Sequence, residues 1–282
     1  MRIILVLLLI CAVSLTHAQP EPYEIFNAKG KKVSYRKMLH RLEDQQVILF
    51  GELHNNAIAH WLQVEVTKDL ASRRNIVQGA EMFEADNQEA IDKYLKKEID
   101  QKGLDTLARL WPNHKTDYAP LLDLAKENDR KFIATNVPRR YANRVYRYGF
   151  KTLDSLPEEE KSWIAPLPIA FDPDLPTYQN ILKMMGDHGS EKLVMAQAIK
   201  DATMAHFILE NIESDKVFIH YNGAYHSDFY EGILWYLNRE NPDLKFSTIS
   251  TVVQEELSSL EDEHLGKADF IIVVDSDMTN TY

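Results

Sequence analysis

Short runs of β-branched and aromatic residues alternate along this chain with long amphipathic stretches, and this alternation limits the possible folds most. Strands are predicted at residues 47–50, 76–80, 131–135 and 217–221, with further strands at 245–253 and 270–274. Apolar residues at i, i+3, i+4 spacing predict helices at residues 57–74, 87–97, 117–128, 139–148 and 191–212. Strands that alternate with helices form parallel sheets. We therefore expect an α/β fold with a mostly parallel central sheet flanked by helices.

The N-terminus has the pattern of a secretory signal peptide. One charged residue, Arg2, precedes an apolar run that ends near Val13, and the small-residue boundary Thr16-His17-Ala18 follows. The run is shorter than the roughly 20 apolar residues that a membrane-spanning helix needs. This pattern predicts residues 1–18 as a signal peptide cleaved after Ala18, and therefore an exported protein.

Cysteine content and charge narrow the possible partners. The single cysteine, Cys11, lies in the predicted signal peptide, so the mature chain would have no disulfide and no cysteine-metal site. Lipidation would make Cys11 the first mature residue, but Leu9-Ile10 places a bulky side chain where a small one is needed. The net charge of −11 argues against nucleic acid or an anionic membrane surface as the main partner. Residues 19–282 fit one α/β domain.

Residues 163–189 interrupt the alternation. Four prolines limit regular helix in the first half of the segment, and Met184-Met185-Gly186-Asp187-His188-Gly189 ends it. The segment also carries Trp163, Phe171 and Tyr178, which a solvated loop seldom combines. We expect a partly helical, partly irregular insertion that covers the site and through which two copies pair to form a homodimer. An ordinary surface connection is the alternative.

Polar residues follow four of the predicted strands. The motif Gly51-Glu52-Leu53-His54 comes after the first strand, and the same form returns as Gly223-Ala224-Tyr225-His226 after the strand at 217–221. Glu81 ends the second strand, and Asn136 and Arg139 follow the third. Ligands bind at the carboxyl edge of parallel sheets, so we expect Glu52, His54, Glu81 and His226 to face one crevice.

Further polar residues are expected to support this site. His60 lies six residues after His54, where a helix cap or a core position is the plain alternative. Gln197 and Asp201 are one turn apart on the helix at 191–212, either in a solvated stripe or with Asp201 orienting a site imidazole. Glu81 follows an apolar run, so its carboxylate needs a partner such as His54, Arg139 or a cation.

Together these residues resemble a known family. Glu52, His54 and Glu81, the segment Asn136-Val137-Pro138-Arg139, Gln197, Asp201, Met204 and Ala205, and Asn222-Gly223 with His226 look like the ChaN-type haem-binding uptake proteins of the Tiki superfamily. The resemblance covers residues 47–226. It implies an α/β core, haem bound near a helical cover at a subunit interface, ligation of iron by tyrosine with histidine assistance, and a place in the periplasm or at the outer membrane. The sequence departs from this pattern in lacking a lipoprotein cleavage site.

Haem binding needs an apolar slot, an axial ligand and cations for the propionates, and a phenolate is a hard donor that suits ferric iron. The candidate ligands are Tyr178 and Tyr118, and Arg139 and His188 are the candidate propionate partners. Trp163, Met184 and Met185 are candidates for the slot, although a methionine pair is also common in cores.

Two other classes of function stay open. The paired Gly-x-x-His motifs also resemble hydrolases of the wider superfamily, in which Glu52, His54, Glu81 and His226 would bind a divalent metal ion and one carboxylate would activate water. The chain has no G-x-S-x-G nucleophile elbow, which disfavours acyl-serine chemistry. The third class is a non-catalytic interaction protein that uses the aromatic residues of 163–189 as a partner surface.

Overall fold

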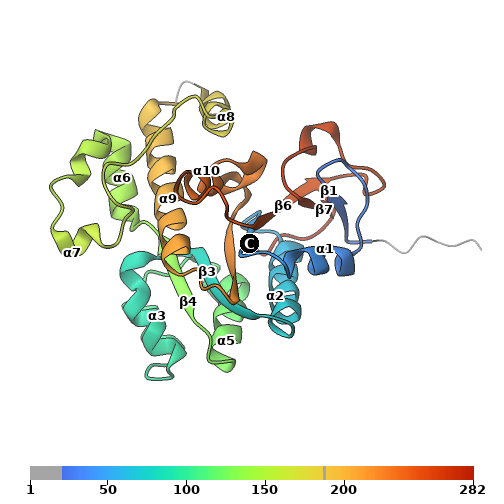
Figure 1. The fold of residues 1–282 in the computed structure, drawn as a ribbon, viewed down its shortest axis with the longest axis horizontal. Coiled ribbons are helices and arrows are strands. Elements are labelled where there is room, and N and C mark those ends of the chain that lie inside the picture. The colour runs from blue at the N-terminus through green and yellow to red at the C-terminus, as the bar shows by residue number, and fades with distance from the viewer. Residues whose placement is uncertain (1–20, 187–188) are drawn as a thin grey trace, which may run out of the picture.

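The computed structural model describes residues 21–186 and 189–282 (Figure 1). The predicted signal peptide and the candidate propionate partner His188 lie outside these residues. Within these two ranges, every helix is too short or too polar to cross a membrane.

A seven-stranded sheet forms the centre of the described structure. Its strand order is β1-β7-β6-β2-β5-β3-β4, and all neighbouring strands are parallel except β1 and β7. The strands are β1 (Tyr23–Asn27), β2 (Val47–Glu52), β3 (Asn75–Glu84), β4 (Phe132–Asn136), β5 (Lys216–Gly223), β6 (Phe246–Gln254) and β7 (Phe270–Asp275). The sheet confirms the predicted mostly parallel α/β fold, and β1 has no counterpart among the predicted strands.

Helices cover both faces of the sheet. They are α1 (Tyr35–Leu42), α2 (Ala57–Ala71), α3 (Gln88–Leu95), α4 (Gln101–Leu107), α5 (Ala119–Glu127), α6 (Arg139–Tyr148), α7 (Glu158–Lys161), α8 (Pro176–Met185), α9 (Glu191–Glu210) and α10 (Ile233–Glu240). Figure 1 shows α9 and α10 on one side of the strands and α2 and α5 on the other. Polar caps start two long helices, because Asn56 accepts a bond from the amide of Ala59 and Ser190 accepts one from the amide of Leu193.

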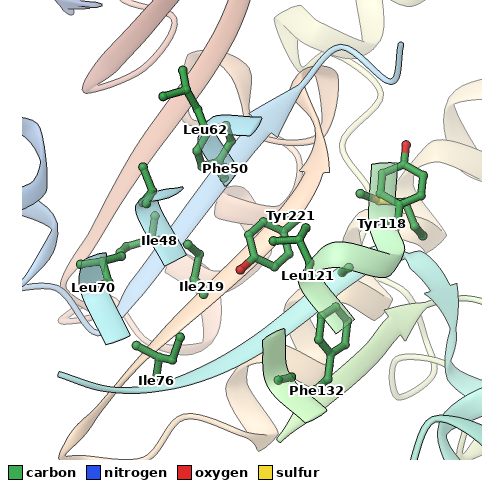
Figure 2. Packing of buried hydrophobic residues seen from close by; sticks show 14 of the residues in the cluster. Ile48, Phe50, Leu62, Leu70, Ile76, Tyr118, Leu121, Phe132, Ile219 and Tyr221 are labelled. Carbon is green, nitrogen blue, oxygen red and sulfur yellow. The ribbon is translucent and has the colours of Figure 1, made fainter. Parts of the chain in front are cut away.

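The central strand β2 is buried along its whole length. Ile48 and Phe50 face the layer of α2 and α5, whereas Val47 and Leu49 face the layer of α9 and α10. Side chains of a strand alternate between its two faces, and a parallel strand covered on both faces is apolar throughout. Figure 2 shows Ile48 and Phe50 among the apolar side chains of their layer.

The outer strand β4 has its open edge closed by one side chain. Gln88, the first residue of α3, donates from Nε2 to the carbonyl of Phe132 at 2.9 Å and accepts from the amide of Ala134 at 2.7 Å. An uncovered edge strand is a template for pairing with another chain. Gln88 therefore protects this end of the sheet.

The inserted segment is irregular in its first half and helical in its second. Residues 163–175 form neither helix nor strand, and α8 follows. Tyr178 of α8 is buried against Val194 and Ala198 of α9. The segment thus has the mixed character predicted from its prolines and aromatic residues.

Candidate functional site

A cavity of about 1060 Å³ opens at the carboxyl ends of β2, β3 and β5. Glu52 ends β2 and Glu81 lies near the end of β3, while His54 and His226 follow β2 and β5. All four residues line the cavity. Because β5 lies between β2 and β3, residues far apart in the sequence meet here. This is the arrangement that the polar residues at the strand ends predict.

Glu52 is a buried carboxylate surrounded by donors. Its Oε1 lies 2.9 Å from His54 Nδ1 and accepts a bond from the Tyr118 hydroxyl at 2.9 Å, while its Oε2 accepts from the Gln63 amide at 2.7 Å. Burial raises the pKa of this carboxyl, but the bonds from His54 and His60 outweigh burial and hold the pKa below its usual value. Glu52 is therefore an anion that orients the His54 ring.

His54 is the more accessible of the two site imidazoles, with 38% of its side chain exposed. Burial lowers its pKa, but the bond to Glu52 and the charge of Glu81 raise it above the ordinary value. With Nδ1 held by Glu52, the ring turns Nε2 toward Gly223 and Glu81.

His226 lies between two buried carboxylates. Its Nε2 is 3.2 Å from Glu81 Oε1 and its Nδ1 is 2.5 Å from Asp201 Oδ1. Burial lowers the pKa of His226, but the two carboxylates outweigh burial and raise the pKa to about 9. His226 in turn holds the pKa of Glu81 well below its usual value against the effect of burial. At neutral pH both ring nitrogens of His226 are donors.

Gly223 lets the two imidazole–carboxylate pairs approach each other. A Cβ atom at this position would lie 2.8 Å from His54 Cε1 and 2.9 Å from His54 Nε2. The Gly223 backbone, at φ −59° and ψ 138°, is open to any residue. Its amide donates to Glu81 Oε2 at 2.7 Å. Glycine is needed here for space, not for backbone freedom.

Tyr118 and Tyr178, the two predicted iron ligands, are buried behind the site. The Tyr118 hydroxyl donates to Glu52, and the Tyr178 hydroxyl donates to Asp201 at 2.8 Å. Burial and the nearby carboxylates raise the pKa of both phenols well above the ordinary value. A ligating tyrosine must lose its proton, so this placement argues against the prediction that either residue binds iron.

The other predicted residues are spread around the cavity. Arg139, Met184, Asn136 and Gln197 line it. Trp163 does not line it and packs near Arg140, whose guanidinium lies 5.2 Å from the indole ring.

Three more of the predicted residues lie at the edge of the site or behind it. Met185 lies at the exposed end of α8. His60 is buried, 3.4 Å from Glu52 and 3.5 Å from Asp117. Asp201 reaches the site only through His226. His60 therefore contacts the main site through Glu52, and Asp201 contacts it through His226.

The structure adds residues that sequence reasoning missed. Tyr225 lines the cavity, is 47% exposed, and donates from its hydroxyl to Met184 Sδ at 3.3 Å. Lys200 of α9 also lines the cavity. Tyr225 lies inside the second Gly-x-x-His motif, so its place was readable from the sequence. Gln63 lies one helical turn after His60, which is a weaker signal.

The predicted divalent metal site has no support in this geometry. Within residues 21–186 and 189–282, a single trio of His, Cys, Asp or Glu ligand atoms lies within 4.8 Å of one another, and it is formed by Glu261, Glu263 and His264. Glu52, His54, Glu81 and His226 are engaged with one another in pairs instead. Metal ligands have to converge on one point.

Comparison with known proteins gives consistent matches. The chain is similar in structure to ChaN of Campylobacter jejuni, whose solved structure shows cofacial heme binding, with a TM-score of 0.69, 18% identity, and coverage of 91% of this chain and 98% of that one. A protein from Bacillus cereus has a TM-score of 0.50 at 12% identity, with 90% and 94% of the two chains covered. At these identities the likeness shows the fold alone.

The curated relative Protein RETICULATA-RELATED 5, chloroplastic, of Arabidopsis thaliana is 24% identical over 201 residues, or 65% of this chain. The match spans 26% of that plant protein's length. The family model described as haem-binding uptake, Tiki superfamily, ChaN matches residues 38–237. That range is most of the sequence, and the chain therefore belongs to the ChaN family of haem-binding uptake proteins in the Tiki superfamily.

Proposed function

We propose that this protein binds haem in the cavity at the carboxyl ends of β2, β3 and β5 and serves haem or iron uptake. The observation that carries the proposal is a half-exposed tyrosine, Tyr225, at a large cavity with apolar walls, in a member of this family. Bound haem would supply a ferric iron with an open coordination position for a phenolate.

The cavity fits a large flat ligand. Its volume of about 1060 Å³ is at the upper end of ordinary ligand pockets, roughly 300–1,000 Å³. Its apolar lining residues include Leu53, Leu110, Trp111, Pro112, Ile181, Met184 and Val253. Arg139 and Lys200 line the same cavity and bring positive charge that suits the two propionates.

Tyr225 is better suited to ligate iron than the two buried tyrosines. Its hydroxyl contacts the Met184 thioether, a weak and uncharged acceptor. A neighbouring carboxylate opposes loss of the phenol proton, as at Tyr118 and Tyr178, whereas a thioether does not. His54, partly exposed and with Nδ1 already held by Glu52, is the imidazole that assists from the cavity floor.

We extend the proposal to assembly and location. Met184 and Met185 at the end of α8 are 62% and 44% exposed. Haem in an open cavity would also leave apolar area exposed. A second copy that packs through residues 163–189 would bury the two methionines and the exposed part of the haem. Sizing with and without haemin tests the homodimer. N-terminal sequencing of protein recovered from cell fractions tests cleavage after Ala18 and a periplasmic or outer-membrane location.

A haemin titration of single tyrosine variants tests the ligand. Tyr225→Phe should lose the tyrosinate charge-transfer band and bind haemin at least about tenfold more weakly, or about 1.4 kcal/mol. Tyr118→Phe and Tyr178→Phe are the matched controls and should keep the wild-type spectrum. A wild-type spectrum and affinity in Tyr225→Phe, with loss in either control, would assign the ligand to a buried tyrosine. Absence of a Soret shift in the wild-type protein would refute haem binding.

A second candidate function is hydrolysis by acid–base chemistry. Glu52 holds Nδ1 of the partly exposed His54 and leaves Nε2 at the cavity, which is the geometry of a histidine that transfers a proton to or from a substrate. Turnover of activated esters with a chelator present, abolished in His54→Gln, would support it. Equal rates in wild type and His54→Gln would exclude it.

A further inference from the structure

The loop between β6 and β7 is held rigidly at the rim of the cavity. The buried side chain of Gln254 donates from Nε2 to the carbonyls of Glu256 and Ser259, and its Oε1 accepts from the amide of Glu261 at 3.2 Å. Leu260 packs into a small apolar cluster with Phe26, Val252 and Ala268. The backbone at Glu261 is therefore fixed, and a short 3₁₀ turn, Asp262–His264, follows it.

His264 in this turn is a buried imidazole without partners. It is 5% exposed and lines the cavity wall, and neither Nδ1 nor Nε2 has a hydrogen-bond partner in the described part of the chain. The nearest acid is Glu263, whose Oε1 lies 3.8 Å from His264 Nε2. A buried polar group without a partner costs about 1–3 kcal/mol. A group from outside the chain would remove this cost.

Two exposed carboxylates lie beside this imidazole. Ligand atoms of Glu261, Glu263 and His264 are all within 4.8 Å of one another. Ligands about 2.1 Å from a metal ion lie roughly 3.0–3.5 Å apart, so the exposed glutamates need to move by only about 1 Å. Neither nitrogen of the His264 ring has a hydrogen-bond partner in the described residues, and one nitrogen of a neutral imidazole carries a lone pair that can bind a metal ion.

We propose that Glu261, Glu263 and His264 bind a divalent transition-metal ion, such as Zn²⁺, at the rim of the cavity. Imidazole nitrogen selects the first-row transition metals over Mg²⁺ and Ca²⁺, and two carboxylates balance the charge of the ion. Water completes the coordination at the exposed side. The site is separate from the pairs at Glu52 and Glu81, and it does not depend on haem binding.

Titration of the untagged, chelator-treated protein with ZnCl₂ by calorimetry tests the site. We expect one equivalent of Zn²⁺ to bind, and excess Mg²⁺ or Ca²⁺ not to displace it. His264→Gln and Glu263→Gln should each weaken Zn²⁺ binding by at least about tenfold, the low end of what even outer-shell changes cost a metal site. Glu263 is 76% exposed, so its variant removes a ligand without disturbing the core.

Two control variants locate the bound ion. Glu256→Gln removes a carboxylate from the same loop outside the trio and should leave the Zn²⁺ affinity unchanged. His54→Gln removes the accessible imidazole of the main cavity floor and should also leave it unchanged. Loss of the equivalent in His54→Gln but not in His264→Gln or Glu263→Gln would overturn the proposal, and so would wild-type protein that binds no Zn²⁺. Haemin titration of the same variants tests haem binding separately.

Discussion

Replacing Glu81 with glutamine should change how the stability of the protein depends on pH. Glutamine keeps the shape of the side chain and an oxygen for the amide of Gly223, which lies 2.7 Å from Glu81 Oε2. It removes the negative charge 3.2 Å from His226 Nε2 and leaves Asp201 as the only carboxyl group bonded to that ring. Removing one member of a buried ion pair costs about 3–5 kcal/mol.

The pH window follows from the pKa of His226. In the folded protein this pKa rises from the ordinary 6.5 to about 9. At about 1.4 kcal/mol for each pH unit, that rise contributes roughly 3.5 kcal/mol to the free energy of unfolding. Because the folded pKa is raised, the contribution is complete below pH 6.5 and is lost as pH rises through about 9. Destabilisation by Glu81→Gln should therefore be largest near pH 6 and smallest above pH 9.

Urea unfolding between pH 6 and 9.5 measures this dependence. The slope of the free energy of unfolding against pH should be flatter in Glu81→Gln than in wild type, while Glu158→Gln, an exposed control, should keep the wild-type slope. Glu81 also raises the pKa of His54, so NMR titration of the two rings assigns the effect. An unchanged slope together with an unchanged His226 pKa in Glu81→Gln would refute the electrostatic account of this site.

Two further substitutions test the packing of the site and of the sheet edge. Gly223→Ala should push the His54 ring away from Glu52, because the new Cβ would lie 2.8 Å from His54 Cε1. The pKa of His54 should then fall, and the affinity for haemin should drop. An unchanged His54 pKa in an NMR titration would contradict this. Gln88→Ala removes two hydrogen bonds to β4 and should lower the free energy of unfolding by about 1–3 kcal/mol. Gln45→Ala, which removes one exposed hydrogen bond, is the control. An equal loss of stability in both variants would show that Gln88 does not support the edge of the sheet.

The strands and long helices were readable from the sequence because burial on both faces forces apolar runs, as in β2. Short elements were harder to predict from the sequence. β1 has five residues and gains its place only by pairing with β7, from the opposite end of the chain. The helix α8 begins at Pro176, and a segment rich in proline gives no periodic signal over its first half.

The site shows the same division between local and tertiary information. A general rule about parallel sheets brings Glu52, Glu81 and His226 to one edge without any knowledge of contacts. Which tyrosine is buried depends on how α8 packs on α9 and on the turn that precedes α5, and neither has a sequence signature. Burial there ties Tyr118 and Tyr178 to carboxylates and leaves Tyr225 at the cavity.

The strand order also determines when this protein can fold. β2 and β3 lie close together in the sequence, yet the strand between them, β5, comes from residues 216–223. During synthesis from the N-terminus, β2 and β3 are made before β5, so each has an inner edge without its shared partner strand. Unpaired edges of this kind promote aggregation. A chain that ends before residue 216 lacks β5, so β2 and β3 have no strand between them. The sheet therefore forms only when nearly the whole chain takes part.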